Sequence, residues 1–372
     1  MVTTAQSKPP QCSAPIRVMV VDDSAVVRGL IVRILEDDPS IEIAATCSNG
    51  MLAVQQAARI KPDVVILDVE MPVMDGLTAL PKLLEVDPSM RIIMASTLTQ
   101  RNARVSMDAL ERGAADYLPK PTTSGVAASN DFRRELLQKV VALGHHPAQP
   151  RVPVRPAAAF KSSLFPAGSG FKLRASRPSQ PQVLVIGSST GGPQALMTLL
   201  AKLPPVIDVP ILVAQHMPAT FTAILAQHIA RASGRPCAEA AHNKVLRAGS
   251  IYLAPGDYHL ETARAGTALV AHLTQAPPEN FCRPSVNPLF RSAARLFGAN
   301  VCAVMLTGMG SDGLDGTRQL AEAGAPVIAQ DEASCVVWGM PGAIATGGLC
   351  TAVLPLTEIA AHVAAIMSGG RR

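Results

Sequence analysis

The sequence predicts an α/β protein with two domains of alternating strands and helices. Its 372 residues are too many for one ordinary hydrophobic core and sufficient for two. In two blocks of the chain, short β-branched apolar runs alternate with segments of helical periodicity. Residues 144–181 separate these blocks and contain seven prolines, six Lys or Arg, and no Asp or Glu. Such a stretch is typical of an extended linker, and contact with an acidic partner is the alternative to a solvated tether.

The first block, residues 16–137, is expected to form a compact domain around a five-stranded parallel sheet. Its strands are continuously apolar, which predicts burial on both faces and therefore helices on both sides of the sheet. Residues 1–15 lack the apolar core of a signal peptide and are expected to be a disordered tail. The expected strands are residues 16–23, 41–47, 63–69, 91–97 and 115–120.

The second block, residues 182–368, is expected to form a doubly wound domain around a mostly parallel sheet. Residues 259–264 and 267–273 flank Gly266, which predicts an antiparallel β-hairpin inserted in this sheet. A last strand and a packing helix should follow residue 345. The other expected strands are residues 183–189, 210–216, 250–255, 300–308 and 326–331.

Composition excludes several classes of function. The sequence has no apolar run of the roughly 20 residues that a membrane-spanning helix needs. Seven cysteines without a CxxC pair indicate reduced thiols, so a cytoplasmic protein is expected. Aromatic residues make up 3% of the chain and the net charge is only +5, which argues against nucleic-acid binding.

Polar residues at the carboxyl ends of the first-block strands predict a phosphoryl-transfer site. Asp22 and Asp23 follow the first strand, Asp68 the third, Thr97 the fourth and Lys120 the fifth. In a parallel sheet these ends share one edge, where ligands bind. Three convergent carboxylates repel one another unless a divalent cation such as Mg²⁺ lies among them. A hydroxyl and an ammonium group nearby would neutralise a transferred phosphoryl group.

The strand ends of the second block predict either a phosphate-binding turn or a nucleophilic serine. Ser189 lies in a Gly-containing turn between a strand and a helix, as hydrolase nucleophiles do. The turn lacks the GxGxxG and GxxxxGK patterns of nucleotide sites, which weakens the first interpretation. His216 follows the next strand and could act as the base. Asp312 or Asp315 could supply a carboxylate, although both also suit turns.

The segments VVDDS and LDVEMPVMDG, with Lys120 followed by proline, resemble the response-regulator receiver family across the first block. This resemblance implies a flavodoxin-like receiver domain that is phosphorylated on Asp68. It also implies Mg²⁺ bound by Asp23 and Asp68 with Asp22 in support. Thr97 and Lys120 would form the switch.

The segments GSSTGG, QHMP, YLAPGD, LTGMGSDG and IAQDEASCVVWGMP resemble the catalytic domain of the chemotaxis protein-glutamate methylesterases across residues 182–365. The resemblance implies a serine hydrolase with Ser189 as nucleophile, His216 as base and Asp312 as orienting carboxylate. Its substrates would be glutamate methyl esters on chemoreceptors, with methanol released, and deamidation of receptor glutamines would be the companion activity. A chemotaxis histidine kinase would be the phosphodonor. Contact with membranes would run only through the receptors, and the esterase reaction would need no cofactor.

The resemblance extends to residues around the nucleophile, with Ser188 in the small position before it. Two positions depart from the family pattern, because Cys282 stands where a histidine is usual and Asn287 where an aspartate is common. We expect these departures to alter receptor preference or turnover without abolishing activity, and we do not expect Cys282 to be the nucleophile. The residues implied to form the oxyanion site or to shape the cleft are Thr190, Arg283, Met309 and Gly310.

The two domains are expected to act together. The unphosphorylated receiver would obstruct Ser189, and phosphorylation of Asp68 would weaken that packing. The alternative is a non-catalytic response regulator whose second domain only binds receptors. A DNA-binding output domain is excluded because no helix-turn-helix segment follows the receiver and the second block has an α/β pattern.

Overall fold

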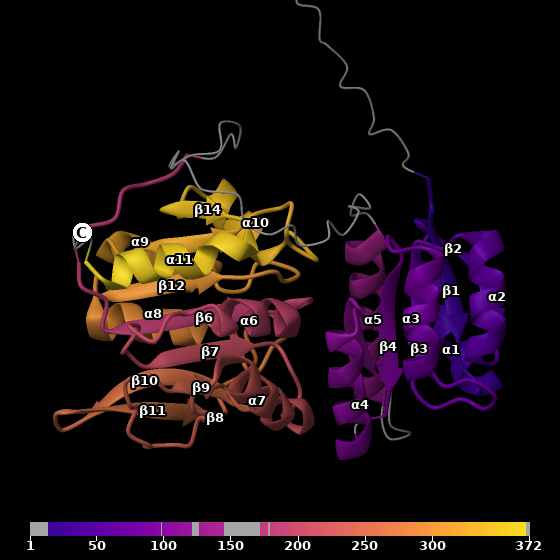
Figure 1. The fold of residues 1–372 in the computed structure, drawn as a ribbon, viewed down its shortest axis with the longest axis horizontal. Helices are drawn as coiled ribbons and strands as arrows, with labels where there is room; N and C mark the ends of the chain where they lie inside the picture. Colours follow the sequence, from indigo (N-terminus) through magenta and orange to yellow (C-terminus); the bar gives the residue numbers. More distant parts are fainter. Residues whose placement is uncertain (1–13, 98, 121–125, 145–171, 178, 370–372) are drawn as a thin grey trace, which may run out of the picture.

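The computed structural model describes residues 14–97, 99–120, 126–144, 172–177 and 179–369, which form two α/β domains side by side (Figure 1). Nearly all of the expected N-terminal tail and most of the expected linker lie outside the described residues. Among the residues that are described, no helix combines the length and the apolar character needed to cross a bilayer.

The N-terminal domain contains a five-stranded parallel sheet in the order β2-β1-β3-β4-β5, as the sequence predicts. Helices α1 and α5 bury apolar side chains on one face of the sheet, and α2, α3 and α4 cover the other face. The strands are β1 (Ile16–Val21), β2 (Ile41–Cys47), β3 (Val64–Asp68), β4 (Arg91–Ser96) and β5 (Asp116–Pro119). The helices are α1 (Ala25–Glu36), α2 (Gly50–Ile60), α3 (Gly76–Val86), α4 (Gln100–Glu111) and α5 (Val126–Gly144).

Local chemistry fixes where these helices begin. Ser24, Asn49, Asp75 and Thr99 each have extended backbone and accept a hydrogen bond from an amide in the first turn of the helix that follows. This satisfies one of the orphan donors of each helix and places the helix starts directly after the strand ends. Helix α5 continues to Gly144, beyond the expected end of the domain at residue 137.

The C-terminal domain contains a seven-stranded parallel sheet in the order β14-β13-β12-β6-β7-β9-β8. Helices α6, α7 and α11 cover one face, and α8, α9 and α10 cover the other. The strands are β6 (Val183–Ser188), β7 (Ile211–Gln215), β8 (Cys237–Glu239), β9 (Ile251–Leu253), β12 (Val301–Met305), β13 (Val327–Gln330) and β14 (Ala352–Leu354). The helices are α6 (Gly192–Ala201), α7 (Ala219–Ser233), α8 (Val286–Phe297), α9 (Leu314–Ala323), α10 (Met340–Thr346) and α11 (Leu356–Met367).

Three details of this domain differ from the expectation. The hairpin of β10 (His259–Ala265) and β11 (Ala268–Thr274) forms a two-stranded sheet of its own instead of joining the large sheet. Strand β8 at the sheet edge was not expected, because three residues are too short to show a pattern. At the end of the expected linker, Arg174 donates hydrogen bonds to the carbonyls of Cys350 and Leu349 at 3.0 and 2.8 Å, so this segment is bound to the C-terminal domain.

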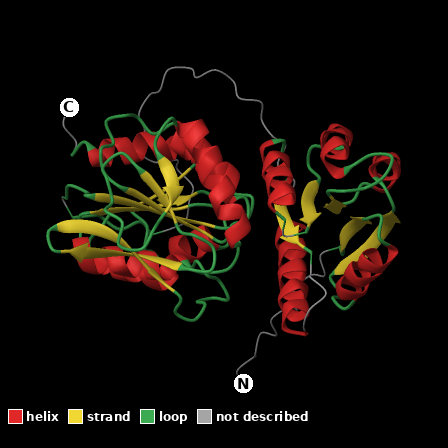
Figure 2. Ribbon diagram, turned by 90° about the horizontal axis from the view of Figure 1, so that it is seen from below, coloured by secondary structure: helices red, strands yellow, loops and turns green. Residues whose placement is uncertain are grey.

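The two domains face each other (Figures 1 and 2), and the receiver contacts the C-terminal domain through α4 and β5. Helix α4 packs against α6 and α7. Tyr117 of β5 stacks on Phe221 of α7, with ring centroids 4.5 Å apart and planes inclined by 17°. Gln194 of α6 donates hydrogen bonds to the carbonyls of Leu110 and Ala114 at the end of α4. Apolar stacking and hydrogen bonds to backbone groups are therefore among the contacts that join the domains.

Candidate active site

The chain order of the C-terminal sheet creates a place for a site at its centre. From β6 the chain passes to β7 on one side, and it later returns to β12 on the other side. Ligands in open α/β sheets bind where the strand order diverges in this way, outside the carboxyl ends of the strands. Ser189, His216 and Asp312 follow the ends of β6, β7 and β12, so the sequence-predicted residues converge at this point.

Ser189 lies in a tight turn that leads from β6 into α6. Gly191 has a φ of +73°, a left-handed conformation that favours glycine, and a Cβ there would lie 2.5 Å from the side chain of Val336. A Cβ on Gly308 would lie 2.9 Å from the Cβ of Ser189, so the loop after β12 packs directly on Ser189. The turn therefore holds Ser189 between a strand and a helix N-terminus, and its side chain is only partly buried.

A continuous hydrogen-bonded relay runs from the serine to a buried carboxylate. Ser189 Oγ lies 3.1 Å from His216 Nδ1, and His216 Nε2 lies 2.7 Å from Asp312 Oδ2. A carboxylate only accepts hydrogen bonds, so Nε2 carries a proton, and in the neutral form of the ring Nδ1 presents its lone pair to the serine hydroxyl. Asp315, the alternative from the sequence, is exposed and pairs with Arg318 on the surface of α9.

Asp312 is held by several donors at once. It accepts hydrogen bonds from Ser285 Oγ at 2.7 Å and from the backbone amides of Val286 and Gly313 at 2.6 and 2.8 Å. Asn280 Nδ2 donates a further bond at 3.1 Å. Burial opposes the charge, but hydrogen bonds and the charge of His216 outweigh it and lower the pKa of Asp312 to about 2. The carboxylate is therefore ionised near neutral pH.

The relay opens into a cleft of about 500 Å³ that both domains line. Thr190, Met309 and Gly310, expected near the oxyanion, all line it beside Ser189. Arg283 lines it as well, but its guanidinium is bound to Asp257 Oδ1 at 2.6 and 3.0 Å and to two backbone carbonyls. The receiver contributes one wall, made by Asp116, Tyr117, Asp131, Arg134, Glu135, Gln138 and Lys139.

The structure adds residues that the sequence did not single out for the site. Gln215 accepts a hydrogen bond from Ser188 Oγ at 2.7 Å and donates to the carbonyls of Ser189 and His216, both at 3.0 Å. One amide thus ties the end of β6 to the end of β7. Its position as the last residue of a strand beside a predicted catalytic histidine is the signal that could have identified it.

The two positions that depart from the family pattern have different surroundings. Asn287 is buried outside the relay, where its Oδ1 accepts a hydrogen bond from Gly316 N at 2.9 Å and ties α8 to α9. Cys282 lies inside the site, with its Sγ 3.3 Å from His216 Nδ1. Burial lowers the pKa of His216, but charge interactions and hydrogen bonds with Cys282 and Asp312 outweigh burial and raise it.

The three predicted carboxylates and Lys120 come together at the edge of the N-terminal sheet. Lys120 Nζ lies 2.7 Å from both Asp22 Oδ2 and Asp68 Oδ1, and both carboxylates are buried. The exposed Asp23 completes a cluster in which the three carboxylates have oxygen atoms within 4.8 Å of one another. Burial raises the pKa of Asp68 to about 6, against the lowering effect of Lys120. An all-oxygen set of this size fits Mg²⁺, which binds through one or two carboxylates and retains waters.

Thr97 lies at the end of β4 but does not join this cluster. Its side chain is exposed, and its Oγ1 accepts a hydrogen bond from Asn102 Nδ2 at 2.7 Å. Asn102 belongs to α4, the helix that packs on the C-terminal domain. A movement of Thr97 would therefore reach the domain interface through one hydrogen bond.

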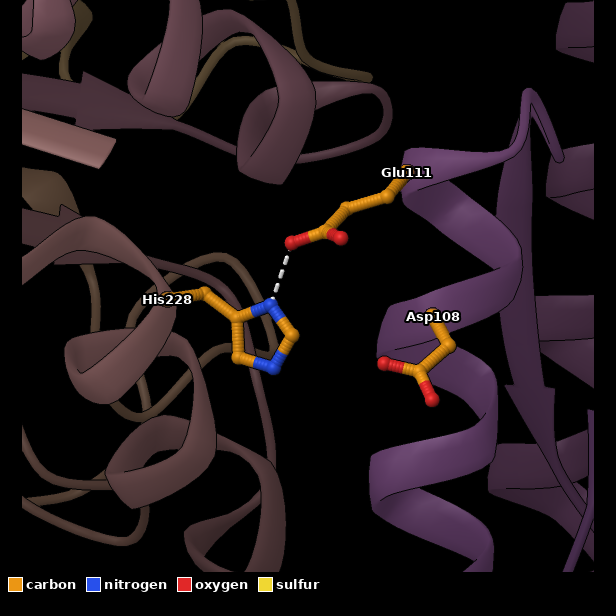
Figure 3. Close-up of side chains that lie close together, drawn as sticks. All are labelled: Asp108, Glu111 and His228. Atoms are coloured by element: carbon orange, nitrogen blue, oxygen red, sulfur yellow. Dashed lines mark hydrogen bonds and ion pairs between the residues drawn. The ribbon is translucent and has the colours of Figure 1, made fainter. Parts of the chain in front are cut away.

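The same interface contains a polar cluster across the two domains (Figure 3). His228 of α7 is buried, and its Nδ1 hydrogen-bonds to Glu111 Oε1 at the end of α4. Asp108 lies one turn earlier on α4, with its carboxylate directed toward the imidazole ring (Figure 3). This hydrogen bond links α4 of the receiver to α7 of the C-terminal domain.

Fold and sites together define a response regulator whose output domain carries the residues of a serine hydrolase. Residues 18–127 match the model of the response regulator receiver domain, and residues 184–363 match that of CheB methylesterase. The chain belongs to the CheB methylesterase family. A protein-glutamate methylesterase/protein-glutamine glutaminase of Paramagnetospirillum magneticum is 51% identical, with 96% of this chain and 97% of the relative covered. The corresponding protein of Rhodospirillum rubrum is 50% identical, with 97% and 98% covered.

A solved structure resembles each half of the chain. The CheB methylesterase catalytic domain of Thermotoga maritima is 36% identical with a TM-score of 0.49, and the match covers 50% of this chain and 98% of that one. The response regulator domain of CheB from the same organism is 37% identical with a TM-score of 0.32, and the match covers 34% and 94%.

Proposed function

We propose that this chain demethylates glutamate methyl esters on chemoreceptors and deamidates receptor glutamines, under control of phosphorylation at Asp68. The observation that carries the catalytic part is the relay from Ser189 through His216 to the buried Asp312. Full-length relatives at about half identity bear the name protein-glutamate methylesterase/protein-glutamine glutaminase, which supports the same reactions.

The geometry supports acyl transfer through a covalent intermediate. His216 Nδ1 takes the proton of Ser189 Oγ as the oxygen attacks the ester carbonyl, and Asp312 stabilises the imidazolium that forms. His216 then returns the proton to the leaving oxygen, and methanol departs. Water, activated by the same imidazole, hydrolyses the glutamyl ester of Ser189. A glutamine side chain passes through the same acyl-enzyme, with ammonia as the leaving group.

The oxyanion of this reaction needs donors beside Ser189. The amide of Ser189 itself donates to the carbonyl of Thr307 at 3.0 Å and is not available. The backbone amides of Thr190 and of the Met309–Gly310 turn border the cleft at the nucleophile, and we assign the oxyanion site to them. Arg283, with its guanidinium bound to Asp257, shapes the cleft wall instead of contacting the reacting atoms.

Phosphorylation of the receiver would use the acidic cluster. Asp68 is the phosphoacceptor, and Asp22, Asp23 and Asp68 are the residues that would hold Mg²⁺. The metal supplies charge neutralisation for the transferred phosphoryl group. Lys120, already 2.7 Å from Asp68, would contact a phosphoryl oxygen once its ion pair is replaced. A histidine kinase of the chemotaxis system is the phosphodonor that this site suits.

Control of catalysis follows from the wall that the receiver places on the cleft. Residues of β5 and α5 border the same cavity as Ser189, so a receptor helix cannot reach the serine while the domains are packed. Phosphorylation changes the surroundings of Thr97, and its bond to Asn102 passes the change to α4. Opening of the α4 interface would then expose the relay.

The test is methanol release from methylated receptor membranes by the full-length protein, with and without a small-molecule phosphodonor. We expect phosphodonor to stimulate the wild type, Ser189→Ala to lose roughly a thousand-fold or more of the activity, and Asp68→Ala to lose only the stimulation. Ser368→Ala, which changes a serine at the end of α11, is the control and should behave as the wild type. Activity that persists in Ser189→Ala would leave only a binding function for the second domain.

A further inference from the structure

The active site contains a second nucleophile on the same base. Ser189 Oγ and Cys282 Sγ lie 3.1 and 3.3 Å from His216 Nδ1. The neutral ring has one lone pair at that nitrogen, so it can accept a proton from only one of the two groups at a time. Thiols as a class are far more acidic than aliphatic hydroxyls, and a thiol beside an imidazole is the usual arrangement of a reactive cysteine.

Other features of the site favour a reactive thiol. Cys282 is partly exposed and lines the cleft that opens at Ser189. It lies in a loop in which Asn280 and Phe281 have φ values of +50° and +63°, a conformation that is strained for a bulky side chain and is typical of functional loops.

The other described cysteines provide a contrast within the same chain. Burial raises the thiol pKa values of Cys237, Cys302 and Cys350 to about 12, and it raises those of Cys47 and Cys335 as well. Buried thiols of this kind are inert, whereas a thiol paired with an imidazole reacts as the thiolate. Cys282 is the one cysteine among the described residues that lines the cleft.

We propose that Cys282 is a modification site for hydroperoxides and that its oxidation reversibly blocks the active site. Cys282 Sγ attacks one peroxide oxygen, the O–O bond breaks, and the proton on His216 passes to the leaving oxygen. Hydrogen peroxide thus yields Cys282 sulfenic acid, water and neutral His216. The added oxygen fills space next to His216 Nδ1 and competes with Ser189 for that nitrogen. Two equivalents of a thiol restore Cys282, with one disulfide and water as products.

The first experiment measures the reactivity of the thiol and does not depend on the proposed function. Full-length protein is treated with iodoacetamide at pH 6.5, and alkylation of each cysteine is followed by mass spectrometry. We expect Cys282 to react fastest, and about ten-fold faster than in His216→Gln. Cys237 is the internal reference and should react at the same slow rate in both proteins. Equal rates at Cys282 in the two proteins, or a rate as slow as that of Cys237, would overturn the proposal.

The second experiment measures the consequence for hydrolysis and rests on the proposed function. Methanol release is measured before hydrogen peroxide, after it, and after dithiothreitol, and each protein is normalised to its own untreated activity. We expect the wild type and Cys237→Ser to lose most activity and to regain it, and Cys282→Ser and Cys282→Ala to be insensitive. Equal loss in the Cys282 variants would refute the block. If neither Cys282→Ser nor Cys282→Ala hydrolyses the ester, the alkylation rates of the first experiment decide whether Cys282 is the reactive thiol.

Discussion

Tyr117 of the receiver stacks on Phe221 of the catalytic domain, with 4.5 Å between their ring centroids. Tyr117 is the second residue of β5, two residues before Pro119 and three before Lys120 of the proposed phosphorylation site. Phe221 lies in the first turn of α7, which begins directly after the loop of His216. Only a few residues of the chain therefore separate the stacked pair from the proposed reactive groups of both domains. A structural change at either site would reach the packing of the interface through this short segment.

Weakening of the interface should raise the activity of the unphosphorylated protein. Glu111→Gln replaces the carboxylate that hydrogen-bonds to His228 Nδ1, and a polar contact with one half-exposed partner contributes about 0.5–1 kcal/mol. We expect a two- to five-fold increase in methanol release without phosphodonor. Activity with saturating phosphodonor should stay at the wild-type level, because the interface is then already open.

Glu85→Gln is the matched control for this prediction, since Glu85 is an exposed residue of α3. It changes the net charge by the same amount, and its ratio of stimulated to unstimulated activity should equal that of the wild type. An unchanged ratio in Glu111→Gln would mean that the contact between α4 and α7 does not limit opening.

The two acids of the loop after β12 should differ sharply in their importance. Asp312→Asn removes the acceptor of His216 Nε2–H and is expected to lower kcat by roughly a thousand-fold or more. Asp315→Asn affects only a surface pair with Arg318 and should leave kcat within two-fold of the wild type. Initial rates at saturating substrate measure both. Comparable losses in the two variants would remove Asp312 from the relay.

The ionisation of Asp68 should make the stability of the receiver depend on pH. Its pKa is about 6 in the folded protein and about 3.9 in an unfolded chain. The folded state therefore holds the proton more tightly, so this group stabilises the fold most below pH 4, and that contribution is lost as pH rises through 6. Asp68→Asn has no such titration. Its stability relative to the wild type should rise by about 1–3 kcal/mol between pH 4 and pH 7.

Hydrogen exchange of β1 and β3 amides in a urea series, corrected for intrinsic exchange rates, measures this difference without added magnesium. Glu36→Gln, a change at an exposed acid of α1, should show a constant difference across the same pH range. A stability difference for Asp68→Asn that is independent of pH would show that burial does not raise the pKa of Asp68.

Much of the fold and of the candidate site could be predicted from the sequence, because polar residues mark the ends of the strands. Asp22, Asp68, Ser189, His216 and Asp312 all follow continuously apolar runs, and a parallel sheet brings such positions to one edge. The hydrogen bonds that orient Asp312 were not predicted, for a physical reason. Ser285 and Asn280 reach Asp312 from a loop and a helix start that are distant in sequence, and their local pattern is that of ordinary turns and caps.

The domain interface was even harder to predict from the sequence. Helix α4 has the amphipathic pattern of any surface helix, and nothing in it distinguishes the side that meets solvent from the side that meets α7. The hairpin illustrates the same limit, since periodicity and a turn glycine predict two paired strands but not the sheet they belong to.

The amide of Gln215 should prove essential for positioning the nucleophile. Its Oε1 accepts a hydrogen bond from Ser188 Oγ, and its Nε2 donates to the carbonyls of Ser189 and His216. Gln215→Leu leaves both carbonyls and the Ser188 hydroxyl without this partner and should destabilise the domain by about 1–3 kcal/mol. Since the turn then loses its link to β7, kcat should fall by roughly 10–100-fold with little change in KM.

Gln215→Glu tests whether the hydrogen bonds of this side chain, and not only its size, hold the turn in position. The side chain keeps its size and its acceptor for Ser188, but a carboxylate oxygen replaces the amide donor and faces two carbonyl oxygens. We therefore expect a loss of kcat at least as large as in Gln215→Leu, and partial recovery at low pH as the carboxyl group protonates and can donate again. Wild-type kcat in Gln215→Glu at pH 7.5 would show that the two turns hold their positions without this link.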